Sequence, residues 1–189
     1  MIPGAFDYLA PRSVDEVLAA LAQHGDDAKI LAGGQSLIPA MRFRLASPTV
    51  LIDINHLANL EYVQVGNGRL TIGALAREQA LEHSAEIARD FPMLHDAALV
   101  IADPLVRNRA TVGGNLAHAD PANDHPAVML AYGAEVVARG PGGTRTIPID
   151  ELFVGLFETS LAHDELLTEI RIPLPGPGAG GGHRRAEAL

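Results

Sequence analysis

The chain has 189 residues, of which 48% are hydrophobic and 20% are charged, a profile typical of a folded globular protein rather than a disordered one. Its formal net charge of −9 argues against nucleic-acid binding, because nucleic-acid-binding proteins normally present a basic patch. The sequence contains no cysteine, which excludes disulfides, thiolate zinc sites and cysteine-held iron–sulfur clusters on these residues and fits a reducing compartment.

The N-terminus lacks the basic region and the apolar region of a signal peptide, since it begins Met1-Ile2-Pro3-Gly4. No apolar run is long enough to span a bilayer. We therefore expect a cytoplasmic protein without a membrane span.

The first quarter of the chain alternates between strand and helix patterns. Strands are expected at residues 6–10, 29–32 and 49–54, a helix is expected from a Ser13/Glu16 capping box to Gly25, and a short helix is expected after Ser36 as its cap. The run 49–54 is apolar enough to be an interior strand. This order predicts parallel pairing in a small α/β unit.

The pattern changes after residue 56. Two hairpins are expected around the turns 66–68 and 140–143, and a last strand at 166–172. Residues 76–102 read as helical pieces that stop at Asp103-Pro104, and another helix opens at Asp124. The expected fold class is α+β, with the small parallel unit at 1–56, an antiparallel sheet with helices at 57–175, and a flexible Gly/Pro-rich tail at 176–189.

Two short segments place adjacent glycines between an apolar run and a hydrogen-bonding side chain. The first glycine segment reads Ala32-Gly33-Gly34-Gln35-Ser36, and the second glycine segment reads Thr111-Val112-Gly113-Gly114-Asn115. Glycine permits positive φ and close approach of a ligand to the backbone, and successive exposed N–H groups bind anions such as phosphate. Either segment alone is equally compatible with an ordinary tight turn, but the pair favours a dinucleotide.

The two segments match neither common phosphate-binding motif. The first has no lysine after its glycines, unlike a Walker loop, and neither has the three-glycine spacing that opens a Rossmann helix. We expect Gly33→Val or Gly114→Val to abolish ligand binding because a side chain would fill the space that a pyrophosphate needs.

Other polar residues have simpler interpretations. The group His118, Asp120, Asp124 and His125 could suggest a metal site, but polar loop residues and a helix start explain it better, and we expect no metal. Arg107 and Arg109 could neutralise phosphate or could equally face solvent or an interface. The run 99–101 is expected to be core.

The glycine segments resemble those of a known family, the flavin-binding medium subunits of the molybdenum hydroxylases, which include aerobic carbon monoxide dehydrogenase and xanthine dehydrogenase. The resemblance covers roughly residues 1–173 and is carried by the runs 32–39, 111–116 and 120–124, together with 6–8 and 101–104. It implies a PCMH-type FAD-binding fold of two subdomains, shared with vanillyl-alcohol oxidase and p-cresol methylhydroxylase.

The resemblance also implies a set of FAD-binding residues. Both glycine segments would hold the pyrophosphate, Asp124 would bind sugar or ribityl hydroxyls, Leu161 would pack on the flavin or adenine, and Lys29 would supply a basic group. Carried over residue by residue, the set is Lys29, Ala32, Gly33, Gly34, Gln35, Ser36, Thr111, Gly113, Gly114, Asn115, Asp124 and Leu161. No separate catalytic residue is expected, because a flavin performs the redox chemistry itself.

The function implied is that of an electron-transfer subunit. FAD would accept electrons from clusters on an iron–sulfur small subunit, which draws them from a molybdenum-cofactor large subunit, and would pass them to an external acceptor. The substrate would be set by the molybdenum subunit. Two alternatives are a truncated, non-catalytic assembly module of the same fold and a stand-alone FAD oxidoreductase, although no substrate pocket or base for the latter is evident.

The chain departs from the family at its end. Family members continue after the strand matching 166–172 with an aromatic-x-Lys segment and a separate C-terminal domain, whereas here residues 176–182 are glycine, proline and alanine. The expected chain is therefore a truncated product, a fragment or a shortened subunit that lacks part of the flavin environment.

Overall fold

The strands lie in three sheets within residues 2–176 and 182, which are the residues that the computed structural model describes. Most of the tail that the sequence predicts to be flexible, residues 177–181 and 183–189, lies outside the described residues. Within the described part of the chain, no helix is both long and apolar enough to cross a membrane.

The first sheet is parallel and is built from the N-terminal quarter of the chain. It contains β1 (Asp7–Leu9), β2 (Ala28–Leu31) and β3 (Val50–Asp53), in the order β1-β3-β2. The strand β3 pairs in parallel with both neighbours. The predictions of parallel pairing and of an interior third strand are confirmed.

Helix α1 (Val14–His24) connects β1 to β2 and begins at the predicted cap. Ser13 Oγ accepts a hydrogen bond from the backbone N–H of Glu16 at 3.2 Å, and Glu16 Oε2 accepts one from the backbone N–H of Arg12 at 2.7 Å. The glutamate therefore reaches one residue beyond the standard capping box. The helix buries Val14, Val17 and Leu21 and ends at Gly25, which has a φ of +53°.

The second sheet is antiparallel, and its central strand comes last in the chain. Its order is β4-β5-β10-β6-β7. The bounds are β4 (Val63–Gly66), β5 (Arg69–Gly73), β6 (Glu135–Gly140), β7 (Gly143–Pro148) and β10 (Leu166–Pro173). Both predicted hairpins are present, and β10 joins them by pairing with β5 and β6.

The remaining helices are short and mostly follow the predicted pieces. They are α2 (Leu37–Arg42), α3 (Glu78–Glu82), α4 (Ala85–Asp90), α5 (Pro92–Val100), α6 (Pro104–Arg107), α7 (Val112–His118), α8 (Asp124–Tyr132) and α9 (Ile149–Leu152), with 3₁₀ turns at Gly25–Asp27 and Ala58–Leu60. Asp103-Pro104 does not stop the helical region, because the Asp103 carboxylate accepts from the N–H groups of Leu105 and Val106 and thereby caps α6. A small hairpin, β8 (Phe153–Gly155) with β9 (Glu158–Thr159), was not expected.

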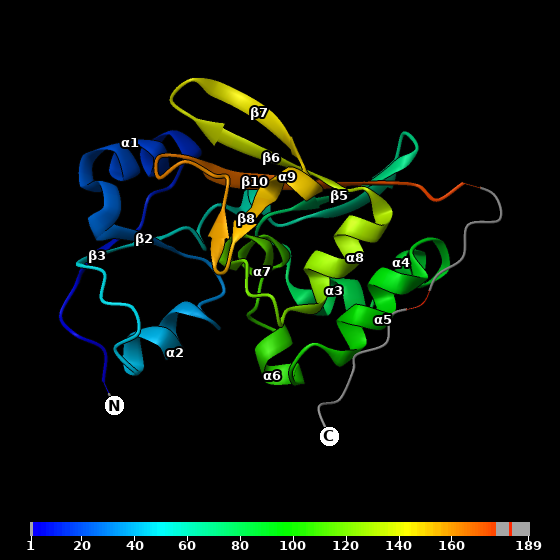
Figure 1. The fold of residues 1–189 in the computed structure, drawn as a ribbon, viewed down its shortest axis with the longest axis horizontal. Coiled ribbons are helices and arrows are strands. Elements are labelled where there is room, and N and C mark those ends of the chain that lie inside the picture. The colour runs from blue at the N-terminus through cyan, green and yellow to red at the C-terminus, as the bar shows by residue number, and fades with distance from the viewer. Residues whose placement is uncertain (1, 177–181, 183–189) are drawn as a thin grey trace.

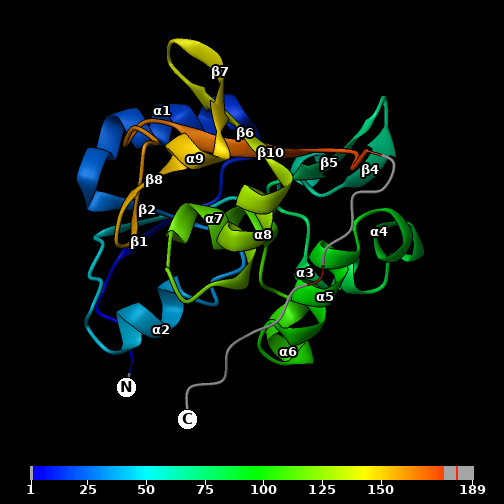
Figure 2. The ribbon, with the colours of Figure 1, turned by 45° about the vertical axis from the view of Figure 1, so that its right-hand side comes forward.

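The helices cover one face of the five-stranded sheet. In Figure 1, α3, α5, α7 and α8 lie below that sheet, and the blue N-terminal unit lies at its left end. A second view shows the same order, with α7 between the N-terminal unit and α8 (Figure 2). The larger core forms where these helices meet the sheet, around fully buried Phe91, Leu116 and Ile170.

A second, smaller core lies under the parallel sheet. It includes Val17 and Ile52 but also Leu57, Leu75 and Leu166, which come from later in the chain. The parallel sheet is therefore packed against the rest of the protein by residues that follow position 56. The division at residues 56 and 57 stays a prediction.

Candidate functional site

The first glycine segment, residues 32–36, is an open turn between β2 and α2. Gly34 has a φ of +74°, a conformation that side chains with a Cβ rarely adopt. Gln35 Nε2 donates to the Gly33 carbonyl at 3.3 Å, which braces the turn. The backbone N–H groups of residues 33–36 donate no hydrogen bond to another described residue. Four successive donors are thus available to an anion.

The expected cap of α2 is absent. Ser36 occupies the N-cap position, but its backbone already has helical angles and its hydroxyl accepts no hydrogen bond from the helix. Its side chain is exposed. The serine therefore lies at the entrance to the open turn and not in a capping interaction.

The second glycine segment, residues 111–115, is the start of helix α7 and not an open loop, so the prediction of a second loop of exposed amides is wrong. Thr111 Oγ1 accepts from the Gly114 N–H at 3.2 Å, and the Gly113 N–H donates to the Ala74 carbonyl at 3.1 Å. The Asn115 N–H donates to the Thr111 carbonyl at 3.0 Å. The glycine amides of this segment are therefore satisfied by the protein.

The first glycine segment packs against residues 109 and 110, which lead directly into the second. A Cβ added to Gly33 would lie 2.4 Å from the Arg109 carbonyl oxygen and 2.8 Å from Ala110 Cα. A Cβ added to Gly114 would lie 2.6 Å from Thr111 Oγ1 and 3.9 Å from Ala32 Cβ. A side chain at Gly33 or Gly114 would therefore first meet protein backbone or the helix cap, and not the space that a pyrophosphate needs.

Beside this contact, Asn115 carries an unpaired polar atom. Its Oδ1 is buried and has no hydrogen-bond partner among the described residues. The Asn115 carbonyl accepts from Asn123 Nδ2 at 3.2 Å, which ties α7 to the residue that precedes α8. Asp124, the first residue of α8, is 8% exposed. Asn115, in the first turn of α7, is thus bonded to the residue that directly precedes Asp124.

The other two predicted site residues lie further along their elements. Lys29 is exposed on β2, three residues before the first glycine segment. Leu161 is half-buried after β9 and packs against the larger core.

Arg107 does not face a phosphate site. Its side chain is 9% exposed, and Nε donates to Glu82 Oε2 at 2.8 Å while Nη1 donates to the Ile101 carbonyl at 2.9 Å. This guanidinium holds the turn between α5 and α6. Arg109 is exposed, and its carbonyl oxygen accepts from Arg77 Nη1 at 2.6 Å.

His125 lies in the predicted helix start, where it is fully buried in the first turn of α8. Its Nε2 lies 2.6 Å from Glu78 Oε2, and both side chains are 0% exposed. His118 belongs to α7 and not to a loop, and its ring lies 5.2 Å from that of Phe157. Among the described residues, no group of three or more histidine or acidic side chains is arranged to hold a metal ion.

The run 99–101 is only partly core. Ile101 is buried, but Leu99 and Val100 are 48% and 43% exposed at the end of α5. The apolar pattern predicted core for all three residues, but the last turn of α5 leaves the core before the chain bends at Ala102, which has a φ of +46°.

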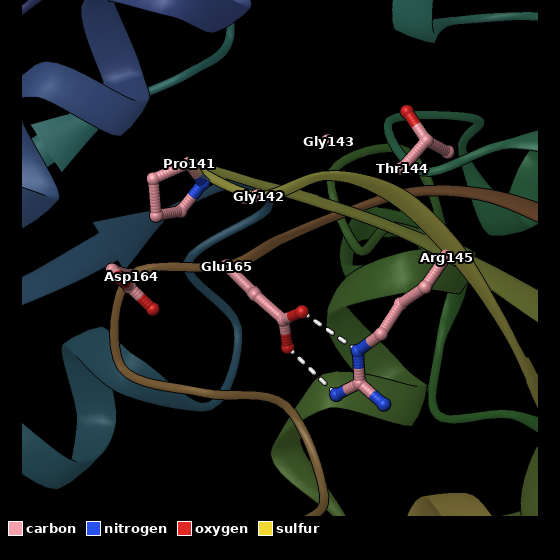
Figure 3. Close-up of a pocket in the computed structure, with 8 residues that line it drawn as sticks. Pro141, Gly142, Gly143, Thr144, Arg145, Asp164 and Glu165 are labelled. Carbon is pink, nitrogen blue, oxygen red and sulfur yellow. Dashed lines mark hydrogen bonds and ion pairs between the residues drawn. The ribbon is translucent and has the colours of Figure 1, made fainter.

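A hollow elsewhere on the surface lacks the chemistry of an anion site. It lies at the β6–β7 turn and is lined by Gly142, Arg145, Asp164 and Glu165, among others (Figure 3). Arg145 forms two hydrogen bonds with Glu165, at 2.7 and 2.8 Å, so its guanidinium is already occupied. None of the predicted site residues lines this hollow.

Comparison with known proteins identifies the family. The chain matches, over residues 4–175, the FAD binding domain in molybdopterin dehydrogenase, and it belongs to that family. The fold is accordingly the PCMH-type FAD-binding fold, the cofactor is FAD, and relatives are subunits of oxidoreductases. The open amides of the first glycine segment and the unpaired Asn115 oxygen fit such a ligand.

Several relatives are closely similar. The carbon monoxide dehydrogenase medium chain of Hydrogenophaga pseudoflava is 47% identical over 95% of this chain and 63% of the relative. The 6-hydroxypseudooxynicotine dehydrogenase complex subunit alpha of Paenarthrobacter nicotinovorans is 44% identical over 95% of this chain and 61% of the relative. The chain thus spans less than two thirds of the length of these relatives.

Solved structures show the same fold. A carbon monoxide dehydrogenase from Hydrogenophaga pseudoflava that lacks the Mo-pyranopterin moiety has a TM-score of 0.91 and 47% identity, over 94% of this chain and 62% of that one. Quinoline 2-oxidoreductase from Pseudomonas putida 86 has a TM-score of 0.88 and 35% identity, over 93% of this chain and 61% of that one.

Proposed function

We propose that the chain is the FAD-binding, electron-transferring part of a molybdenum hydroxylase. When bound, FAD would supply the redox chemistry, taking electrons from iron–sulfur clusters on a small partner subunit and delivering them to an external acceptor. The electrons would originate at a molybdenum cofactor on a large partner subunit, which would also set the substrate. The residues of this chain would bind and orient the cofactor.

The pyrophosphate of FAD would lie against the first glycine segment. The observation that carries the proposal is the run of four successive N–H groups, at residues 33–36, that have no acceptor among the described residues. A doubly charged group bound there would satisfy donors that otherwise lack a protein partner. Because the chain has a net charge of −9, oriented amides must supply the attraction locally.

The second glycine segment would contribute in a different way. Its amides are used within the protein, which leaves the carboxamide of Asn115 as the group that points to a ligand. Asp124 would accept hydrogen bonds from sugar or ribityl hydroxyls, Leu161 would pack on a ring of the cofactor, and Lys29 would offset negative charge. The assignments of Asn115 and Asp124 are supported by the hydrogen bond that ties Asn115 to Asn123, the residue before Asp124.

The partner chains are supported by the relatives and by composition. The names of several relatives describe them as medium chains or subunits of a larger enzyme. The 189 residues contain no cysteine, which agrees with iron–sulfur clusters that are held by a different chain.

Reconstitution with FAD tests the proposal in two steps. The purified chain should bind FAD, seen as flavin fluorescence quenching and a stable visible spectrum after gel filtration. The same chain, tagged and recovered from its native cells, should then co-purify with iron and molybdenum in separate polypeptides. A folded chain that binds no FAD would contradict the proposal, and FAD binding without those metals would favour a stand-alone flavoprotein.

A further inference from the structure

A chain of hydrogen bonds connects the two glycine segments through residues outside them. Asn55, which follows β3, donates from Nδ2 to the Ala32 carbonyl at 2.8 Å and to Asp53 Oδ1 at 2.6 Å. Arg77 donates from Nη2 to Asn55 Oδ1 at 2.9 Å and from Nη1 to the Arg109 carbonyl at 2.6 Å. One side-chain pair therefore reaches the Ala32 carbonyl of the first segment and the Arg109 carbonyl, two residues before the second segment.

The carboxamide of Asn55 is fully engaged. Its two N–H donors face acceptors on different residues, and its oxygen accepts from an arginine. An aspartate or a leucine of the same shape could not donate to the Ala32 carbonyl. Asp53 is fixed in turn, because Tyr8 Oη donates to its Oδ2 at 2.6 Å. Hydrogen bonds thus connect the Ala32 carbonyl through Asn55 to Asp53 and Tyr8, which lie on strands of the parallel sheet.

The backbone around Arg77 supports the second glycine segment directly. Arg77 forms an antiparallel bridge with Thr111, in which the Glu78 N–H donates to the Ala110 carbonyl at 3.1 Å and the Val112 N–H donates to the Ala76 carbonyl at 3.0 Å. The next side chain, Glu78, reaches buried His125 in α8. Residues 77 and 78 consequently join the first glycine segment, the second glycine segment and the helix that carries Asp124.

We propose that Asn55 and Arg77 are positioning residues for the cofactor, which clamp the first glycine segment against the second and keep its four open N–H groups in one arrangement. This inference rests on the proposed function, in that FAD is the ligand of those groups. A loop held in its binding conformation before the ligand arrives loses less conformational freedom on binding. Removal of the clamp should loosen residues 33–36 and weaken FAD without unfolding the protein.

The test uses two single variants, Asn55→Leu and Arg77→Met, and the double variant. Each single change should weaken FAD about 10-fold, and the double variant should be little worse than either single one because both break the same bridge. Arg77→Lys keeps the positive charge but cannot donate from two guanidinium nitrogens to two acceptors, so it should retain only part of the affinity for FAD. Arg139→Met is the matched control, since Arg139 also joins the N-terminal unit to the antiparallel sheet, through Asp15 at 2.7 Å.

A readout in the absence of FAD separates this inference from the proposed function. Backbone ¹⁵N order parameters of residues 33–36 should be about 0.85 in the original chain and clearly lower in the clamp variants, with the unfolding midpoint of each variant close to that of Arg139→Met. Unchanged order parameters would overturn the clamp whether or not FAD binds. If residues 33–36 are loosened but the affinity for FAD is unchanged, the clamp does not position these residues for the cofactor. A loosened segment in a chain that never binds FAD would contradict the proposed function instead.

Discussion

The two glycine segments share a sequence pattern but differ in what their backbone amides do. In residues 33–36 the backbone amides donate to no other residue that the structure describes. In residues 111–115 the same pattern begins a helix, and its amides bond to Thr111 and Ala74. The first segment is therefore suited to hold an anion, while the second forms the surface on which the first rests.

This difference changes the reason why the glycines are needed. Gly33 leaves room for the backbone of Arg109 and Ala110, and Gly113 leaves room for Ala74, whose backbone oxygen would lie 2.6 Å from an added Cβ. Both glycines serve the contact between parts of the protein before they serve a ligand. Substitutions that affect the two segments differently can test this interpretation.

The largest effect is expected from Gly33→Ala. The added methyl group would meet the Arg109 carbonyl oxygen at 2.4 Å, so the two segments must separate. Overpacking of this kind costs roughly 1–3 kcal/mol of unfolding free energy, and we expect FAD affinity to fall about 100-fold or more. Chemical denaturation and flavin fluorescence titration measure the two losses. Gly66→Ala, where nothing lies within 4 Å of the added Cβ, should change neither.

Asn115→Ala should weaken FAD while leaving the fold intact. The Asn115 Oδ1 atom has no partner among the described residues, so its removal breaks no internal hydrogen bond. Loss of one hydrogen bond to a ligand predicts about 10-fold weaker binding. Asn59→Ala, at an exposed residue, serves as the control. Equal affinity of both variants for FAD would show that Asn115 does not face the cofactor.

Thr111→Val should remove the cap of α7. The Gly114 N–H would lose its acceptor, at a cost of about 1 kcal/mol, and the second segment would fray beside the first. Ser84→Ala removes an equivalent cap from α4, where Ser84 Oγ accepts from the Ile87 N–H at 3.2 Å. Thermal denaturation should show similar losses in both variants, but only Thr111→Val should weaken FAD. A similar decrease in FAD affinity for Ser84→Ala would argue for a general stability effect.

The smallest effect concerns the loss of folding stability at acid pH, to which the Asp53 carboxyl contributes. Burial raises the pKa of Asp53, but hydrogen bonds from Tyr8 and Asn55 outweigh it, so the pKa lies below its ordinary value of 3.8. Because the folded pKa is depressed, the stabilisation is complete above the unfolded pKa and is lost as pH falls through the folded pKa.

Tyr8→Phe removes one of those hydrogen bonds and should move the folded pKa of Asp53 upward, towards its unfolded value. The carboxyl then contributes less stability above the unfolded pKa, and its acid loss is smaller and ends at a higher pH. Titration of the Asp53 carboxyl carbon by NMR measures the shift directly. Tyr132→Phe, whose ring contacts Phe91 instead, should leave Asp53 as it was. An unchanged titration in Tyr8→Phe would exclude the tyrosine as a cause.

The sequence predicts most elements of this fold because they rest on local patterns. The Ser13 cap, the Gly66-Asn67-Gly68 turn and the apolar run that becomes β3 each act within a few residues. The start of α7 was not predicted, since Gly113 and Gly114 disfavour a helix by themselves. It forms because Thr111 caps the turn and Ala74 accepts from Gly113 across the sequence.

The clamp and the buried contact between Glu78 and His125 could not be predicted from the sequence, for a related reason. Asn55 and Arg77 meet across 22 positions, and Glu78 meets His125 across 47. A polar residue directly after a buried strand, as at Asn55, is a weak signal for a site at the strand end. Glu78 has no such signal, because an acidic residue at a helix start is ordinarily explained by the helix dipole.

The central claim is that the open amides of the first glycine segment hold the pyrophosphate of FAD, and amide NMR spectra recorded during a titration with FAD test it most directly. The account predicts large shifts at residues 33–36, smaller shifts at the amides of 112–115 that are bonded within the protein, and none at the 66–68 turn. Saturable FAD binding with unmoved signals at residues 33–36 would contradict it.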